Sequence, residues 1–230
     1  MSSLHDKRFP NESKEYRDAR NKLLEEEKKL GDLTAEVAAL RSKLPLGGKV
    51  EEDYIFEELD EKGKLKETKL SELFKPGFDS LAIYSFMYGP QAESGCPGCT
   101  SIIDGLNGVV PHLNDRMNFV VIGKAPIEKL NDWKEKRGWN KTRFLSSGKN
   151  NFNQNYFGED EQGRQLSHLN IFRKTDEGIF HLYGNELTFL PLADGEEERD
   201  MDLISPIGNM FDLIPEGRGK NWFPKNNYTS

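Results

Sequence analysis

The sequence predicts an α/β fold in which helices flank a mixed central sheet, with a long helical arm at the N-terminus. Apolar runs of strand length alternate with helical stretches between residues 81 and 146, as in a sheet with parallel core strands. A charged segment with helical periodicity precedes them. We therefore expect three parts: a helical arm with its linker over 1–48, an α/β domain over 49–214, and a poorly ordered tail over 215–230.

The arm is predicted over residues 11–44, which are rich in Glu, Lys, Arg, Ala and Leu, as one long helix or as two helices joined at Gly31. Asn11 or Ser13 can cap its start, and Pro45 with the glycine pair that follows ends it. Its apolar residues at helical spacing are Tyr16, Ala19, Leu23, Leu30, Leu33, Val37, Ala38, Leu40 and Leu44. This stripe can pack on its own domain, pair with a second copy of the chain in a homodimer, or bind a partner protein.

The domain elements follow in chain order. The expected strands are 54–56, 81–88, 118–123 and 142–146, followed by a hairpin of 169–173 and 179–183. The expected helical segments are 70–74, 100–114, 126–139, a turn or helix at 150–157, and a further segment near the C-terminus. The alternation implies parallel core strands, to which the hairpin adds antiparallel strands at one side.

Cys96 and Cys99 are the only cysteines, and they form a C-x-x-C sequence between the strand 81–88 and the next helix. Thiols three residues apart at the start of a helix have Cβ atoms about 5–6 Å apart, close enough to form a disulfide. The positive end of the helix favours a thiolate, so Cys96 is the predicted nucleophile and Cys99 the resolving thiol. Such a redox-active disulfide needs an external reductant and no resident cofactor.

Charge and hydropathy exclude several classes of protein. The net charge is −7 with acidic and basic residues mixed along the chain, which argues against a nucleic-acid surface. The acidic run 194–198 is expected to be a solvated loop. The first residues lack the apolar core of a signal peptide, and no apolar run reaches the length of a membrane span. We expect a cytoplasmic protein that does not bind membranes, in which a lone C-x-x-C is more often catalytic, redox-sensing or metal-binding than structural.

A string of ordered motifs carries a family resemblance. The motifs lie at 19–30, 53–57, 86–90 with 95–99, 124–126, 137–139 and 153–158. The element order and the C-x-x-C position resemble the thioredoxin fold, and the motifs resemble the DUF899 family. That family is regarded as thioredoxin-like and related to the alkyl-hydroperoxide-reductase and thiol-specific-antioxidant group. The resemblance implies a thioredoxin-like domain over 49–214 and redox chemistry at Cys96 and Cys99.

Two positions depart from the patterns of thioredoxin-like enzymes. Such enzymes usually carry a cis-proline before the strand that faces the C-x-x-C, and Ser167 stands there instead, followed by His168. Peroxiredoxins have a Pro-x-x-x-Thr/Ser-x-x-Cys pattern, whereas Pro90 and Ser94 precede Cys96 with one residue too few. The candidate residues of a substrate groove are Pro97, Gly98, Ser167 and His168.

Cys99 and His112 are separated as a cysteine and the first histidine of a zinc finger are, but the second histidine of such a finger is missing. Two thiolates with His168 would suit copper, but we expect His168 to be an ordinary loop residue and expect no metal.

The predicted function is a thiol–disulfide oxidoreductase acting on protein or small-molecule disulfides, reduced by a thioredoxin or glutathione system. The alternatives are a peroxiredoxin-like thiol peroxidase acting on peroxides, or a non-catalytic redox or interaction module.

Overall fold

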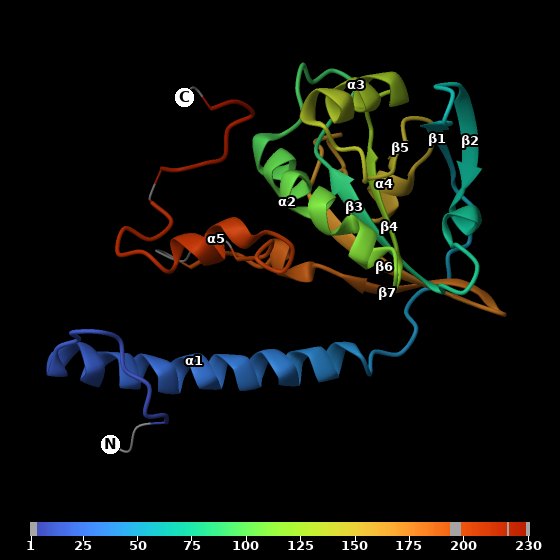
Figure 1. Cartoon of the computed structure of the whole chain (residues 1–230). Helices are drawn as coiled ribbons and strands as arrows, with labels where there is room; N and C mark the ends of the chain where they lie inside the picture. The colour runs from blue at the N-terminus through green and yellow to red at the C-terminus, as the bar shows by residue number, and fades with distance from the viewer. Residues whose placement is uncertain (1–3, 194–198, 220, 229–230) are drawn as a thin grey trace. The chain divides into compact units, whose positions relative to one another are not determined.

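A mixed seven-stranded sheet forms the centre of the larger part of the chain in this computed structural model (Figure 1). The structure describes residues 4–193, 199–219 and 221–228. The acidic run 194–198, expected to be a solvated loop, and residues 220, 229 and 230 of the predicted tail lie outside the described residues.

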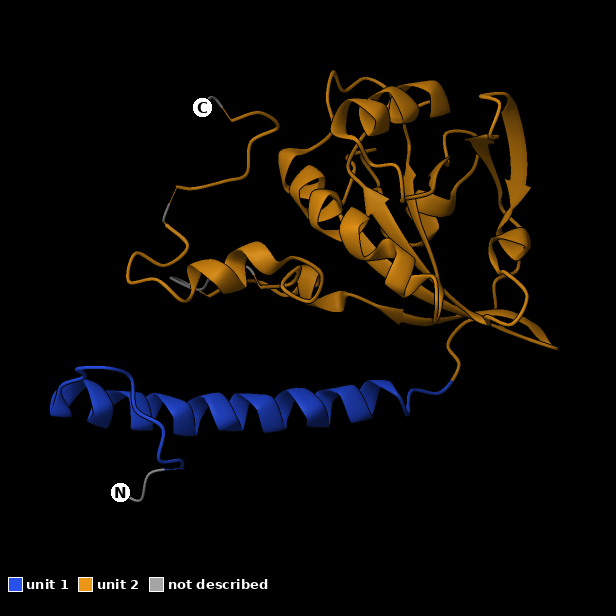
Figure 2. Ribbon diagram, in the orientation of Figure 1, with its two compact units in different colours: residues 1–45 blue, residues 46–230 orange. Residues whose placement is uncertain are grey.

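The chain divides into two units, residues 1–45 and residues 46–230 (Figure 2). The first unit contains α1, Lys14–Arg41. Ser13 is its N-cap residue, because the Ser13 hydroxyl accepts a hydrogen bond from the Tyr16 backbone N–H at 3.1 Å. None of the residues of α1, all of which are described, is buried. The expected arm helix is confirmed, and its apolar side chains remain open to solvent.

Among the residues that the structure describes, the second unit contains the strands and the other helices. The strands are β1 Ile55–Leu59, β2 Leu65–Lys69, β3 Ser80–Phe86, β4 Asn118–Gly123, β5 Phe144–Ser146, β6 His168–Thr175 and β7 Gly178–Gly184. The α-helices are α2 Pro97–Leu113, α3 Ile127–Arg137, α4 Phe152–Asn155 and α5 Pro206–Phe211. Two short 3-10 helices are η1 Leu70–Leu73 and η2 Glu186–Phe189.

The strand order is β2-β1-β5-β4-β3-β6-β7. β3, β4 and β5 are parallel, with α2 and α3 as the connecting helices, whereas β6 runs antiparallel beside β3. The register of that pair places Tyr84 opposite Leu169 and Ser85 opposite His168. The loop after β3 therefore emerges at the carboxyl end of the parallel strands, where reactive groups collect in sheets of this kind.

Each face of the sheet carries its own hydrophobic cluster. The cluster under α2 and α3 contains Ile103, Leu130 and, from β3, Ala82, Tyr84 and Phe86. The alternate β3 residues, Leu81 and Ile83, belong to the cluster on the opposite face, with Phe152 of α4 and Leu73 of η1. This alternation follows from the pleat of a strand, which sends successive side chains to opposite faces.

Glu58 of β1 is a buried carboxylate with several partners. It accepts hydrogen bonds from the Arg143 guanidinium at 2.7 and 2.8 Å and from the Thr68 hydroxyl at 2.5 Å. Burial alone raises the pKa of Glu58, but the bonds from Arg143 and Thr68 outweigh it and lower the pKa to about 2. The ionised carboxylate thus joins β1, β2 and the segment that leads into β5.

The predicted α/β fold with a mixed sheet and a long N-terminal helix is confirmed. The helix after the cysteines begins at Pro97 and not at residue 100, so it includes Cys99. β2 is not predicted from the sequence, because its side chains are exposed and mostly charged, and only Thr68 is buried. Such a strand is held to β1 by backbone pairing, which leaves no apolar pattern in the sequence.

Candidate active site

Cys96 lies at the N-terminus of α2, where the loop after β3 ends. Its backbone N–H donates to the Met87 carbonyl at 3.1 Å, and its own carbonyl accepts from the Thr100 N–H at 2.8 Å. Pro97 follows as the first helical residue, where its missing N–H leaves no bond unmade. The backbone N–H groups of Gly98 and Cys99 donate to the Cys96 sulfur. Folding thus places this thiol at the positive end of a 17-residue helix.

The two thiols have opposite environments. Cys96 is half-buried and Cys99 is 2% exposed, and both are free thiols. A hydrogen bond from the Cys99 thiol lowers the pKa of Cys96 to about 6, against the opposing effect of burial and with support from two backbone N–H groups. The same bond, together with burial, raises the pKa of Cys99 well above its usual range. Near neutral pH the pair is therefore a Cys96 thiolate that accepts a bond from a Cys99 thiol.

Tyr84 of β3 lies on the buried side of Cys99. Its side chain is fully buried, its hydroxyl lies 2.8 Å from the Ser167 hydroxyl, and it also hydrogen bonds to Cys99. Burial raises the pKa of Tyr84 well above its ordinary value, so the phenol keeps its proton at physiological pH. Ser167 thus lies beside the Tyr84 hydroxyl, which also bonds to Cys99.

The loop before Cys96 is tightly packed and bonded to the C-terminal segment. A Cβ at Gly95 would overlap the ring of Phe86, which is itself buried among aromatic side chains, so only glycine fits there. The Gly95 carbonyl accepts a hydrogen bond from the Asn226 side chain at 2.9 Å. The Asn226 carbonyl in turn accepts from Arg137 at 2.6 Å, and Arg137 forms an ion pair with Asp104 of α2.

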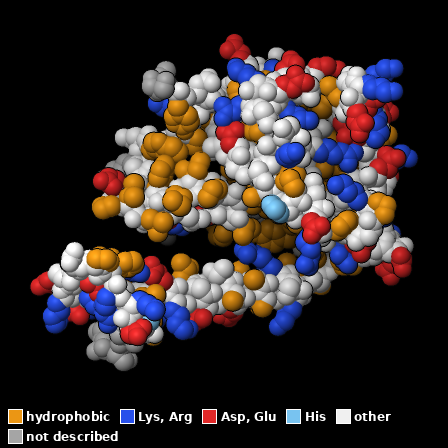
Figure 3. Space-filling view, in the orientation of Figure 1, with side chains coloured by type: hydrophobic (Ala, Val, Ile, Leu, Met, Phe, Trp, Pro, Cys, Tyr) orange, Lys and Arg blue, Asp and Glu red, His pale blue; other side chains and the backbone are white. Residues whose placement is uncertain are grey.

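A cavity of about 790 Å³ opens beside Cys96. Its lining includes both cysteines, Gly98 and Ser167, with apolar side chains from Met87, Ile102, Leu187, Leu190, Leu192, Trp222 and Phe223. Two arginines also line it, and each is paired with aspartate: Arg218 with Asp202 and Asp212, and Arg199 with the same two residues. Figure 3 shows hydrophobic side chains gathered over the C-terminal segment around α5, which supplies part of this wall.

His168 is not brought to the thiols, and it is a buried residue of β6, whereas the sequence predicts an ordinary loop residue. Successive strand residues point to opposite faces, and the next residue, Leu169, belongs to the cluster of Tyr84 and Cys99. The His168 ring instead stacks on Phe189 and meets the edge of Phe157. Burial lowers the pKa of His168 to about 4, so the ring is neutral. Its predicted place in a substrate groove is therefore not observed, and a copper site that includes it is not assembled.

The other residues predicted for a substrate groove or a metal site do not all lie beside the thiols. Pro97 is absent from the described lining of the cavity, whereas Gly98 and Ser167 belong to it. His112 lies in the last turn of α2, about 20 Å along the helix from Cys99 at 1.5 Å per residue. Within the described ranges no three His, Cys, Asp or Glu side chains gather as a metal site would require.

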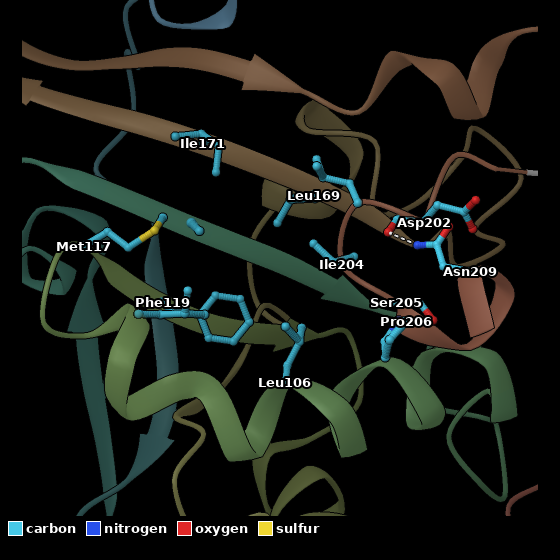
Figure 4. A pocket seen from close by; sticks show the side chains of 13 residues that line it. Leu106, Met117, Phe119, Leu169, Ile171, Asp202, Ile204, Ser205, Pro206 and Asn209 are labelled. Carbon is cyan, nitrogen blue, oxygen red and sulfur yellow. Dashed lines mark hydrogen bonds between the residues drawn. The ribbon is translucent and has the colours of Figure 1, made fainter. Parts of the chain in front are cut away.

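A second cavity, of about 440 Å³, lies between α2, the sheet and the segment 202–209 (Figure 4). Leu106, Phe119 and Ile204 line it, and Asn209 donates to the Asp202 carbonyl at one end. It shares Asp202 and Ser205 with the cavity at Cys96 but does not include either cysteine. The two cavities are therefore neighbours.

Sequence reasoning missed Tyr84, Phe223 and Asn226. Tyr84 looks like one more core aromatic in an apolar run, although period-two counting back from Phe86 would have placed it on the side of α2. Phe223 lies over Gly98 and Asn226 binds Gly95, but both belong to a polar, Gly- and Pro-containing segment without periodicity. Contacts of this kind leave no recognisable pattern in the neighbouring sequence.

The strand order, the antiparallel β6–β7 hairpin and a C-x-x-C at the junction of β3 and α2 define a thioredoxin-like protein. The chain belongs to the DUF899 family, described as "Bacterial protein of unknown function (DUF899)", whose model matches residues 6–229. No curated protein matches it.

Solved structures similar to this chain include peroxiredoxins. The mitochondrial 2-Cys peroxiredoxin from Plasmodium falciparum is 15% identical with a TM-score of 0.47, over 74% of this chain and 95% of that one. Reduced Prx3 in complex with H2O2 from Vibrio vulnificus is 14% identical with a TM-score of 0.45, over 67% and 92%. Among the described residues, none of the helices has the length and apolar character needed to cross a membrane.

Proposed function

We propose that this protein is a thiol–disulfide oxidoreductase in which Cys96 attacks and Cys99 resolves. The observation that carries the proposal is the asymmetry of the pair: a partly buried Cys96 whose pKa is about 6 opens into a cavity, and a buried Cys99 donates to it. A thiolate is the nucleophile in disulfide exchange, and a thiol with a pKa near ambient pH attacks most effectively.

The reaction proceeds in two exchanges. The Cys96 thiolate attacks one sulfur of the substrate disulfide, so that a mixed disulfide forms and the other substrate sulfur leaves as a thiolate that takes a proton from solvent. Cys99 then loses its proton and attacks the Cys96 sulfur, which releases the second substrate thiol and closes the Cys96–Cys99 disulfide. The substrate gains two electrons and the protein loses two. A dithiol reductant of the thioredoxin class, or glutathione, restores the protein.

Tyr84 supports the second exchange. When the Cys99 thiolate forms, the protonated Tyr84 hydroxyl can donate to it, while Ser167 donates to the Tyr84 oxygen at 2.8 Å. Cys99 is buried, so its thiolate has no water to replace this donor. Tyr84 is thus a positioning residue that lowers the cost of forming the resolving thiolate.

The cavity favours substrates that carry apolar groups. Its lining includes leucine, methionine and aromatic side chains, and the arginines that line it are paired with aspartates. A small disulfide with apolar arms, or an extended apolar peptide, fits this surface better than a highly charged substrate.

The proposal is tested by measuring the reduction potential of the Cys96–Cys99 pair and its NADPH-coupled turnover with a thioredoxin reductase system and an apolar aromatic disulfide. We expect repeated cycling. A pair that reacts with hydrogen peroxide much faster than with disulfides would favour the thiol peroxidase instead. A pair that cannot cycle with either substrate would indicate a non-catalytic interaction module.

Removing the Tyr84 hydroxyl is expected to slow the second exchange selectively. Tyr84→Phe should leave the attack of Cys96 nearly unchanged and lengthen the lifetime of the mixed disulfide about 10- to 100-fold, because a hydrogen bond to a charged group contributes about 1.5–3 kcal/mol. Quenched-flow mass spectrometry measures both steps. Tyr88→Phe is the matched control, since Tyr88 is also buried but its hydroxyl lies by the Glu93 carbonyl. Equal lifetimes in both variants would contradict the role of Tyr84.

A further inference from the structure

α1 carries an apolar seam with a seven-residue repeat. Tyr16, Leu23, Leu30 and Val37 lie seven residues apart, and a second row lies three residues after each of them. The second row is Ala19, Glu26, Leu33 and Leu40. These two rows are the a and d positions of four successive heptads, which is the pattern of a coiled coil.

Within the described part of the first unit, residues 4–45, nothing buries the seam. Leu30 is 65% exposed, Leu33 54% and Leu40 62%, and no residue of α1 is buried. Most of the stability of helices in proteins comes from packing an apolar face, and a repeat of exposed leucines over 28 residues forgoes that stabilisation. The seam therefore needs a covering surface of the same length and period.

We propose that α1 pairs with α1 of a second copy of the chain as a parallel, in-register, two-stranded coiled coil. The charges beside the seam indicate which helix covers it. In a parallel pair each g position faces the e position five residues later on the other helix. The facing pairs are Glu15 with Arg20, Lys22 with Glu27, Lys29 with Thr34, and Glu36 with Arg41. Three of these pairs join opposite charges, each occurs twice in the dimer, and none joins like charges.

Antiparallel pairing of the same seam brings like charges together. In one register of full overlap Lys22 would face Lys43, and Arg20 would face Arg41. In the other, Glu27 would face Glu27 and Lys29 would face Lys29 of the second copy. Each antiparallel register also joins opposite charges, Lys29 with Glu36 in the first and Lys22 with Glu36 in the second, but only the parallel pair joins no like charges. Since e and g charges set the orientation of coiled coils, the sequence of α1 favours the parallel pair.

The rest of the helix surface agrees with this assignment. The ion pairs Lys14–Asp18 and Lys28–Asp32, at 2.7 and 2.6 Å, join c and f positions, which lie on the outer face. Glu26 is the single charged residue in the seam, and Lys29 at the adjoining g position bonds to it at 2.8 Å. The outer face thus carries its own i,i+4 pairs, while the apolar rows are left for the second helix.

The oligomeric state of the full chain tests the proposal. At micromolar concentration, light scattering after size exclusion should give twice the chain mass of 26.3 kDa. Leu33→Glu, in the seam, should give the single mass, whereas Ala35→Glu, on the outer face, should keep the double mass. A monomeric wild-type protein, or a dimer that survives Leu33→Glu, would overturn the proposal.

Cross-linking tests the orientation. In a Cys96→Ser, Cys99→Ser background, Tyr16→Cys should form an intermolecular disulfide under mild oxidation, because the two copies of position 16 are adjacent only in a parallel pair. Lys14→Cys, two residues away but on the outer face, should not. A dimer in which Tyr16→Cys fails to cross-link would exclude the parallel arrangement.

Discussion

The Cys96→Ser protein is expected to form no mixed disulfide and to lose all disulfide reduction, whereas Cys99→Ser should perform the first exchange and stop there. The difference follows from position. Cys96 opens into the cavity with a pKa of about 6, while Cys99 is 2% exposed and is held between Cys96 and Tyr84. We therefore expect Cys96 to meet the substrate sulfur first and Cys99 to attack the Cys96 sulfur afterwards.

Mass spectrometry after mixing with an aromatic disulfide measures this outcome. The Cys99→Ser protein should carry one substrate half covalently at Cys96, and the wild-type protein should carry none after completion. Adduct at Cys99 in the Cys96→Ser protein would reverse the assignment.

The pH dependence of alkylation provides an independent check on the same thiol. The rate of modification of wild-type Cys96 by iodoacetamide should rise with pH through a midpoint near 6, because the thiolate is the reacting form. The bond from Cys99 is the largest contribution to the lowered pKa, so Cys99→Ala should move the midpoint upward. Cys99→Ser keeps a hydroxyl donor and should move it less.

Glu58→Gln is expected to lower the stability of the folded protein by about 3 kcal/mol at pH 7. The pKa of Glu58 is about 2 in the folded protein and near 4.5 when unfolded, and each unit of difference corresponds to about 1.4 kcal/mol. The carboxylate is 7% exposed, so water does not replace Arg143 and Thr68 as its partners. An amide keeps the shape but not the charge.

The effect has a defined pH window. Because the folded pKa of Glu58 is depressed, its contribution is complete above about pH 4.5 and is lost as the pH falls toward 2. Urea unfolding at several pH values should therefore show the wild-type and Glu58→Gln proteins converging in acid. Glu67→Gln is the control, since Glu67 is exposed on β2. A constant difference between wild type and Glu58→Gln from pH 7 to pH 2 would argue against the buried ion pair as the cause.

The parts of the fold that depend on apolar periodicity are predictable from the sequence. β3, β4 and α3 lie within a few residues of their expected ranges because each buries a continuous apolar face. β2 has no such face, and its existence depends on backbone pairing with β1. The boundary of α2 moves because Pro97 is well suited to a first helical turn, which starts the helix before Cys99.

The reactive pair itself is predictable, whereas its surroundings are not. Spacing and position were enough to assign Cys96 and Cys99 to a helix N-terminus. The faces of the sheet on which Ser167 and His168 lie depend on the register of β6 against β3. A shift of that register by one residue would exchange the two faces. Arg143 and Lys124 likewise find partners far along the chain, in Glu58 and Glu159, and no local pattern specifies such pairs.

The order in which the chain is synthesised determines when the hydrogen bond from Asn226 to the Gly95 carbonyl can form. A ribosome delivers Cys96 and Cys99 long before it delivers residue 226, so the nascent chain presents its thiols while the loop before them lacks this contact. Until Phe223 comes to lie beside Gly98, the cavity wall that it supplies is also absent. The reactive loop is therefore among the last features of the domain to be completed, and newly made chains expose Cys96 to oxidants more than finished ones do.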